Sequence, residues 1–219
     1  MSSNALATTE NAASESSKRP TVVANFSGYA PPFDPVPIVE KMLASVPAKY
    51  LIGLNKIVLT NSSGLSRQRR RSVTKSRKRK VKIVEAHGLY HAAWNGDRAW
   101  VEIFVDNTLM HWERGWWLSF GFLRESLLGN VLFHEIGHHI HATVQPEFRE
   151  REDVADSWKV KLRREYGRIQ YPWLKVILYP FRPIVRTLCN WAYKREFSKG
   201  LISRGEFEER LKRPVRPEE

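Results

Sequence analysis

The sequence of 219 residues contains one cysteine, Cys189, and no long uninterrupted run of apolar residues. A single cysteine excludes an intrachain disulfide and a cysteine-based metal cluster, so any metal site must use other ligands. It also indicates a reducing compartment, and we expect a cytoplasmic protein. The one candidate for a membrane span, residues 172–191, is interrupted by three basic residues and two prolines. We therefore expect no transmembrane span, and a C-terminal helical extension over residues 171–219.

The N-terminal segment lacks the features of a secretory signal. Its first 20 residues are rich in Ser, Ala, Asn and Thr, and they contain neither a basic segment nor an apolar core. Such a composition cannot bury enough apolar surface to offset the entropy of ordering. We expect residues 1–25 to form a disordered tail.

Acidic residues are scarce relative to basic ones. The sequence has 36 Lys and Arg against 23 Asp and Glu, a net charge of +13, which indicates an anionic partner. Residues 67–80 hold nine of these basic residues in fourteen positions, and Val73 is the only apolar residue among them. We expect an exposed loop or hairpin tip there, able to contact nucleic acid or an anionic surface. Aromatic residues are not interleaved, so base stacking is not indicated. The basic residues are Arg67, Arg69, Arg70, Arg71, Lys75, Arg77, Lys78, Arg79 and Lys80.

Hydrophobic spacing predicts an α+β fold. Apolar residues at helical spacing between Pro37 and Pro47 predict a short helix. Residues 100–106 alternate between apolar and polar positions, which predicts a half-buried strand. Further strands are expected at 56–60 and 81–85, and further helices at 125–143 and 146–166.

The most informative motif is HEIGH at residues 134–138, which lies within the helix expected at 125–143. Residues four apart lie one turn apart on the same side of a helix, so His134 and His138 can reach one metal ion. Glu135 then lies beside the metal without binding it, where its carboxylate can accept a proton from the activated water. The pattern therefore predicts a metal-dependent hydrolytic site.

A third ligand must come from elsewhere in the chain. His141 lies about 10 Å along the helix from His134, too far for bonds of about 2 Å to one ion. His139 points about 100° away from His138, and we expect it at the surface or behind the ligands. The next helix carries Glu152 and Asp156 four residues apart. We assign Glu152 as third ligand and Asp156 as the group that orients a ligand histidine, with exchanged roles or Asp153 as open alternatives.

HEIGH at 134–138 followed by EDVAD at 152–156 resembles the HExxH and ExxxD pattern of the gluzincin branch of zincin metallopeptidases. The short gap between the motifs is similar to that of minigluzincins and ImmA/IrrE-like peptidases. The resemblance implies a small mixed sheet packed on the HExxH helix, with an edge strand beside that helix. It also implies bound Zn²⁺ and a metallopeptidase domain, which we expect over residues 26–170.

The expected function is that of a zinc-dependent metalloendopeptidase with Glu135 as general base and a protein or peptide as substrate. Residues 100–106 are expected to pair with the substrate strand. Two alternatives remain open: a nucleic-acid-binding protein that uses residues 67–80 and has a structural or vestigial metal site, and a closed structural zinc site completed by His139 or His141. Candidate donors to the oxyanion are Tyr166, His111 and Tyr171. Aromatic residues expected in the core or in a lid over the site are Trp112, Trp116, Trp117, Phe120 and Phe122.

Overall fold

The structure is a computed structural model, and it describes residues 19–76, 79–112, 116–143, 151–173 and 187. The chain divides into two units, residues 1–169 and 170–219. The C-terminal extension expected over residues 171–219 lies almost entirely outside the described residues, as does most of the expected N-terminal tail. The first unit carries the sheet, the described helices and the candidate site.

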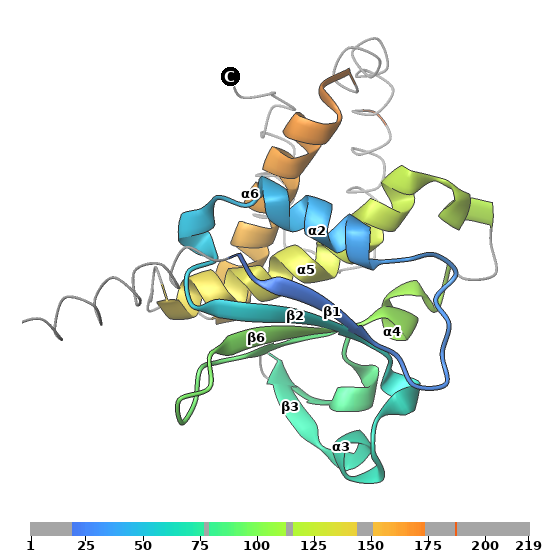
Figure 1. Cartoon of the computed structure of the whole chain (residues 1–219), viewed down its shortest axis with the longest axis vertical. Coiled ribbons are helices and arrows are strands. Elements are labelled where there is room, and N and C mark those ends of the chain that lie inside the picture. The colour runs from blue at the N-terminus through green and yellow to red at the C-terminus, as the bar shows by residue number, and fades with distance from the viewer. Residues whose placement is uncertain (1–18, 77–78, 113–115, 144–150, 174–186, 188–219) are drawn as a thin grey trace, which may run out of the picture. The chain divides into compact units, whose positions relative to one another are not determined.

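A mixed sheet of four strands, in the order β1-β2-β6-β5, forms the centre of the first unit (Figure 1). Strands β1 (Thr21–Asn25), β2 (Leu54–Thr60) and β6 (Ala99–Phe104) run parallel. Strand β5 (Gly88–His91) lies at the edge and runs antiparallel to β6. The α+β class with a small mixed sheet is therefore confirmed.

One face of the sheet is covered by helices. Alternate residues of β2 and β6 point to that face, where Ile57, Val101 and Ile103 are fully buried. Helix α2 (Val36–Ser45) and helix α5 (Gly121–Thr143) pack there. Figure 1 shows both helices above the sheet, with α5 passing behind α2.

Helix α6 (Arg151–Gln170) packs on α5 through an apolar stripe on an otherwise charged helix. Ala155, Trp158 and Leu162 are buried, and their spacing places them on one side of the helix. The ring of Tyr166 lies 6.0 Å from that of Phe133 on α5. Because α6 runs against the direction of α5, its first turns reach the end of α5 that carries the histidines.

Strand β6 differs from the expected half-buried strand at residues 100–106. The strand ends at Phe104, and a short helix α4 (Val105–Leu109) follows. Both faces of the strand are buried, since Glu102 is only 3% exposed and Phe104 is 0% exposed. The second face is covered because Phe104 packs with Leu65 and Ala86 in a small apolar cluster.

Other boundaries also differ from expectation. Residues 21–25, expected in the tail, form β1, which pairs in parallel register with β2. Most of this edge strand is exposed, so its sequence carries little hydrophobic pattern. In place of the strand expected at 81–85, Arg79–Lys82 forms β4 and Ile83–Glu85 forms a 3-10 turn.

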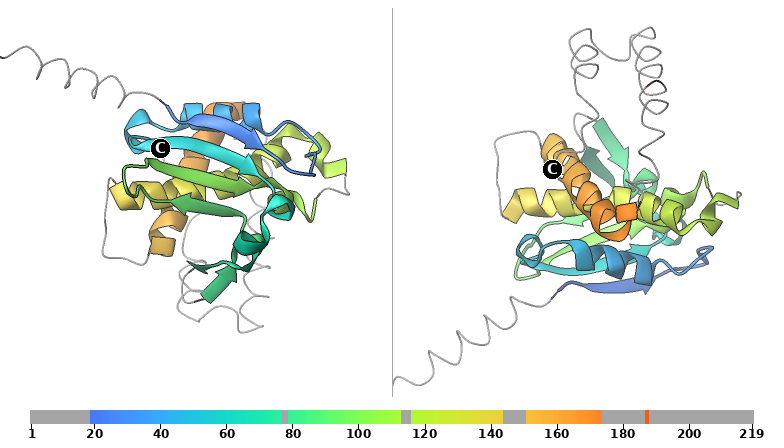
Figure 2. Two further views of the ribbon diagram at one scale, coloured as in Figure 1. Left: turned by 60° about the horizontal axis from the view of Figure 1, so that its bottom comes forward. Right: turned by 90° about the horizontal axis from the view of Figure 1, so that it is seen from above.

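The basic segment forms a short helix and a hairpin. Helix α3 (Arg67–Arg71) begins after Ser66, whose hydroxyl accepts a hydrogen bond from the Arg69 backbone N–H. Strand β3 (Val73–Ser76) then pairs antiparallel with β4. Figure 2 shows that this hairpin extends away from the four-stranded sheet.

Four of the five aromatic residues expected in the core are exposed instead, and the fifth, Trp112, is half-buried. The four lie on the 3-10 helix η4 (Trp116–Ser119) and at the start of α5, and Trp116 is 64% exposed. They do not form a lid over the histidines either, because Phe122 precedes His134 by about 18 Å along the helix. Within the described part of the chain, none of the helices is long and apolar enough to span a membrane.

The junction between β6 and α4 depends on Asp106. Its carboxylate accepts hydrogen bonds from the Ser62 backbone N–H and hydroxyl, both at 2.8 Å, and from the Ser63 N–H at 3.1 Å. Asp106→Ala should lower the free energy of unfolding by about 1–3 kcal/mol, measured by urea denaturation at pH 7, because buried donors lose their acceptor. Asp97→Ala, at an exposed turn, is the control and should change it by less than about 0.5 kcal/mol.

The difference in free energy of unfolding between the wild type and Asp106→Ala should depend on pH, which tests the same contact a second time. Burial raises the pKa of Asp106, but the donors from Ser62, Ser63 and Asn107 outweigh it and hold the pKa below its ordinary value of 3.8. The stability from Asp106 is therefore fully present above about pH 4 and is lost as the pH falls through the lower folded-state pKa. If the difference in free energy of unfolding between the wild type and Asp106→Ala grew on acidification, this role of the Asp106 carboxylate would be contradicted.

Candidate metal centre

Helix α5 presents His134 and His138 away from the sheet. Leu132, Ile136 and Ile140 are fully buried and lie about 200° around the helix from the two histidines. The imidazole rings lie one turn apart, with centroids separated by 4.7 Å and planes at 86°. Burial of the apolar side of α5 thus directs both imidazoles towards α6.

Helix α6 brings a carboxylate to the two rings. Glu152 Oε2 lies 3.4 Å from His134 Nε2 and 3.9 Å from His138 Nε2. Bonds of about 2.0–2.1 Å at tetrahedral angles would place neighbouring ligand atoms about 3.3 Å apart. Among the described residues, these three form the one group of histidine, cysteine and acidic side chains whose ligand atoms, all within 4.8 Å of one another, could hold a metal ion.

Asp156 contacts the far side of one ring. Its Oδ1 lies 3.1 Å from His134 Nδ1 and accepts a hydrogen bond of 2.7 Å from Lys159 Nζ. A proton held on Nδ1 leaves the lone pair of Nε2 facing Glu152. The structure therefore places Glu152 among the ligand atoms and Asp156 behind His134. Asp153 is exposed and is not a member of the group.

Gly137 allows α6 to approach closely. A side chain at this position would place its Cβ 2.7 Å from the Ala155 carbonyl oxygen and 2.8 Å from Ala155 Cα. Backbone atoms cannot yield as a flexible side chain can, so only glycine fits. Two small residues mark this contact in the sequence. Gly137 lies between the two histidines, and Ala155 lies between Glu152 and Asp156.

Glu135 points towards the sheet edge instead of towards α6. It is 6% exposed, and its Oε1 would lie 2.7 Å from a Cβ built on Gly88 of strand β5. The Tyr90 backbone N–H donates a hydrogen bond to it. Burial raises the pKa of Glu135 to about 8, and the negative charge of Glu152 acts in the same direction. Sequence reasoning missed Gly88 and Tyr90, which lie more than 40 residues away in the chain.

His138 favours its neutral form. Burial, together with the positive charge of a protonated His134, lowers the pKa of His138 to about 4. A neutral imidazole keeps the lone pair that metal binding requires.

His139 and His141 do not complete the ligand shell. His139, expected at the surface or behind the ligands, is fully buried, with Nε2 3.0 Å from the Ile52 carbonyl oxygen and Nδ1 3.3 Å from the Tyr90 hydroxyl. Its two nitrogens thus join α5 to neighbouring segments, and the expectation of a surface position was wrong. His141 lies outside the group of ligand atoms.

Two other expectations near the site are also wrong. Tyr166 donates a hydrogen bond of 2.5 Å to Glu125, which precedes His134 by about 13 Å along α5, so it cannot serve as an oxyanion donor. Residues 100–106 cannot pair with a substrate, because β6 lies between β2 and β5. Of the other candidate donors, His111 is exposed in the turn after α4, and Tyr171 belongs to the second unit.

Comparisons with protein-family models, curated proteins and solved structures found no match for this chain. The chemistry of the site therefore rests on the geometry of its own residues.

The contact at Gly137 can be tested by adding one methyl group. Gly137→Ala should displace α6 from α5, separate Glu152 from the histidines and weaken metal binding at least about tenfold, with a lower melting temperature. Zinc titration against a chromogenic chelator measures the affinity. Gly167→Ala, on α6, is the matched control, because a Cβ at that position would meet no neighbouring heavy atom within 4 Å. It should keep zinc affinity and stabilise the helix by about 0.5–1 kcal/mol.

The choice of third ligand can be tested on adjacent carboxylates. Glu152→Gln should reduce the bound zinc well below one ion per chain, because an amide is a poor zinc ligand. Asp153→Asn changes the charge by the same amount and should leave the stoichiometry near one. Elemental analysis of the dialysed proteins measures both, and equal zinc loss in the two variants would contradict the assignment of Glu152.

Proposed function

We propose that the chain is a zinc-dependent metallopeptidase of compact gluzincin type. One observation carries the proposal: three ligand atoms from two helices converge next to a buried carboxylate, Glu135, that lies between them and an edge strand. An antiparallel edge strand beside the HExxH helix agrees with the arrangement that the resemblance to gluzincins implies.

The donor set suits zinc. Two imidazole nitrogens and one carboxylate oxygen are the ligands of catalytic zinc sites that keep a fourth position open. When bound in such a site, zinc lowers the pKa of a water ligand towards 7 and polarises a substrate carbonyl. His134, His138 and Glu152 would hold the ion, and Asp156 would keep the His134 ring in the orientation and tautomer that binding requires.

Glu135 is the residue placed to move protons. As general base it accepts a proton from the attacking water, and it then transfers that proton to the nitrogen of the leaving amine. Its burial against Gly88 excludes bulk water from one side of the carboxylate. The Tyr90 N–H keeps the carboxylate at the sheet edge.

The edge strand β5 supports an extended peptide as substrate. It pairs with β6 on one side, and no other strand of the described residues pairs with it. The Tyr90 N–H points away from β6, since it reaches Glu135 on α5. A peptide added to this edge as a further strand would have its backbone beside both Glu135 and the ligand group.

The role of Glu135 can be separated from metal binding. Glu135→Gln should retain one zinc per chain but lower the rate of peptide cleavage by about 10²–10⁴-fold, because the amide cannot accept the proton. The measurements are zinc content and the cleavage of a library of quenched fluorescent peptides. Glu165→Gln, at a half-buried position of α6 outside the metal-binding group, is the control for loss of one negative charge.

Two results would contradict the proposal. The first is full peptidase activity in the Glu135→Gln protein. The second is a wild-type protein that carries one zinc per chain and cleaves none of the library peptides.

A further inference from the structure

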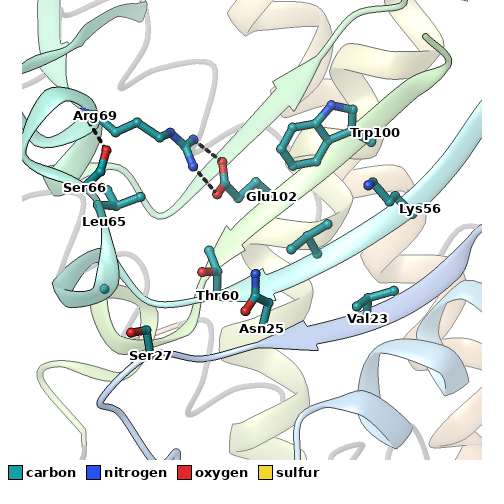
Figure 3. A pocket seen from close by; sticks show the side chains of 12 residues that line it. Val23, Asn25, Ser27, Lys56, Thr60, Leu65, Ser66, Arg69, Trp100 and Glu102 are labelled. Atoms are coloured by element: carbon teal, nitrogen blue, oxygen red, sulfur yellow. Dashed lines mark hydrogen bonds and ion pairs between the residues drawn. The ribbon is translucent and has the colours of Figure 1, made fainter.

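A groove of about 410 Å³ lies on the face of the sheet opposite α5 (Figure 3). Its floor is formed by alternate residues of β1, β2 and β6, among them Lys56, Trp100 and Glu102. Its wall is the segment that leads into α3, which contributes Leu65, Ser66 and Arg69. None of these residues belongs to the candidate metal centre, so the groove is a separate site.

The residues that line the groove carry a net positive charge. Of the residues that line it, Glu102 carries the only negative charge, and Arg69 neutralises it through two hydrogen bonds of 2.7 and 3.0 Å, drawn in Figure 3. His91 Nε2 lies 3.3 Å from the same carboxylate. Among the residues that line the groove, no further acidic side chain is present to compensate the Lys56 ammonium, which lies near Trp100 and Val23.

An aromatic stack lies beside Lys56. The Trp100 and His91 rings are parallel within 6°, with centroids 3.8 Å apart. Lys56 Nζ lies 5.6 Å from the centroid of the Trp100 ring. A planar ligand ring could replace the ammonium over Trp100, since stacking of a nucleobase is worth more than an exposed cation–π contact. The displaced ammonium would then be available for a phosphate.

The basic arm, defined by the described residues 67–76 and 79–82, begins at the wall of this groove. Arg67, Arg71, Lys80 and Lys82 are exposed. Among the described residues, the only ion pair of the arm is that of Arg69 with Glu102. A two-stranded hairpin of this length is marginal by itself, so a bound polyanion would stabilise it.

We propose that the groove and the basic arm together bind single-stranded nucleic acid. The phosphates of a strand can pair with the exposed cations of the arm, and an unpaired base supplies the ring for Trp100. A duplex keeps its bases stacked inside, and a membrane surface or a polysaccharide polyanion has no such ring. The unpaired strand is therefore the one polyanion that uses both parts of the site.

Fluorescence anisotropy of the full chain with labelled oligothymidylate tests the proposal. The triple variant Arg67→Gln, Arg71→Gln, Lys80→Gln should weaken binding about 100-fold at about 0.1 M salt and reduce the salt slope by about 2. The control triple variant Lys49→Gln, Lys161→Gln, Arg168→Gln removes the same charge from η1 (Ala48–Tyr50) and α6. It should change affinity and salt slope far less.

The groove is tested separately from the arm. Trp100→Leu should weaken binding about fivefold or more, and Trp100→Phe should retain most of it because a phenyl ring still stacks. Melting temperatures close to that of the wild type show that these variants are folded. Wild-type protein should prefer oligothymidylate to a duplex of equal length, to heparin and to phosphatidylserine vesicles.

Three outcomes would overturn the proposal. Equal loss in the arm and control variants would mean that only net charge matters. Unchanged affinity of the Trp100→Leu variant would show that no base stacks on Trp100 in the groove. Binding to heparin or vesicles at least as tight as to oligothymidylate would identify a general polyanion or membrane surface. None of these outcomes bears on zinc binding or on peptidase activity.

Discussion

The approach of α6 to α5 at Gly137 is the contact on which the candidate metal centre depends. With no side chain at that position, Ala155 packs directly on α5, and Glu152 and Asp156 lie on either side of the contact. One carboxylate then faces the two ligand nitrogens, and the other faces the opposite nitrogen of His134. The distances between the candidate ligand atoms and the contact of Asp156 with His134 both follow from this one helix crossing.

The sheet separates two regions of different chemistry. Helices on one face bury Glu135 against strand β5, while His134 and His138 face Glu152 of α6. The other face has a groove, and the pairing of Arg69 with Glu102 joins the basic arm to the sheet there. Because Glu102 lies on β6 between β2 and β5, the arm is attached to the most central part of the structure. The two regions can therefore act on different partners without sharing a residue.

Much of the local structure was predictable because short-range patterns determine it. The helix between Pro37 and Pro47 and the helix carrying HEIGH follow from apolar residues at helical spacing. Three expectations were wrong for reasons outside their own segments. Strand β1 is exposed and gains its structure from pairing with β2. Strand β6 is buried on both faces because a distant segment covers the second one. The aromatic residues near 116–122 lie beyond the part of α5 that packs on the sheet.

The sequence by itself determined the chemical identity of the candidate metal centre. The spacing of His134 and His138 places two imidazoles on one side of any helix, and Glu152 and Asp156 repeat that spacing. Only the tertiary structure decided which carboxylate faces the ligand nitrogens, that Glu135 meets β5, and that Trp100 and Lys56 share a groove with the basic arm. The physical reason is that helical periodicity acts over a few residues, whereas these contacts join segments brought together by burial of the sheet and by the absence of a side chain at Gly137.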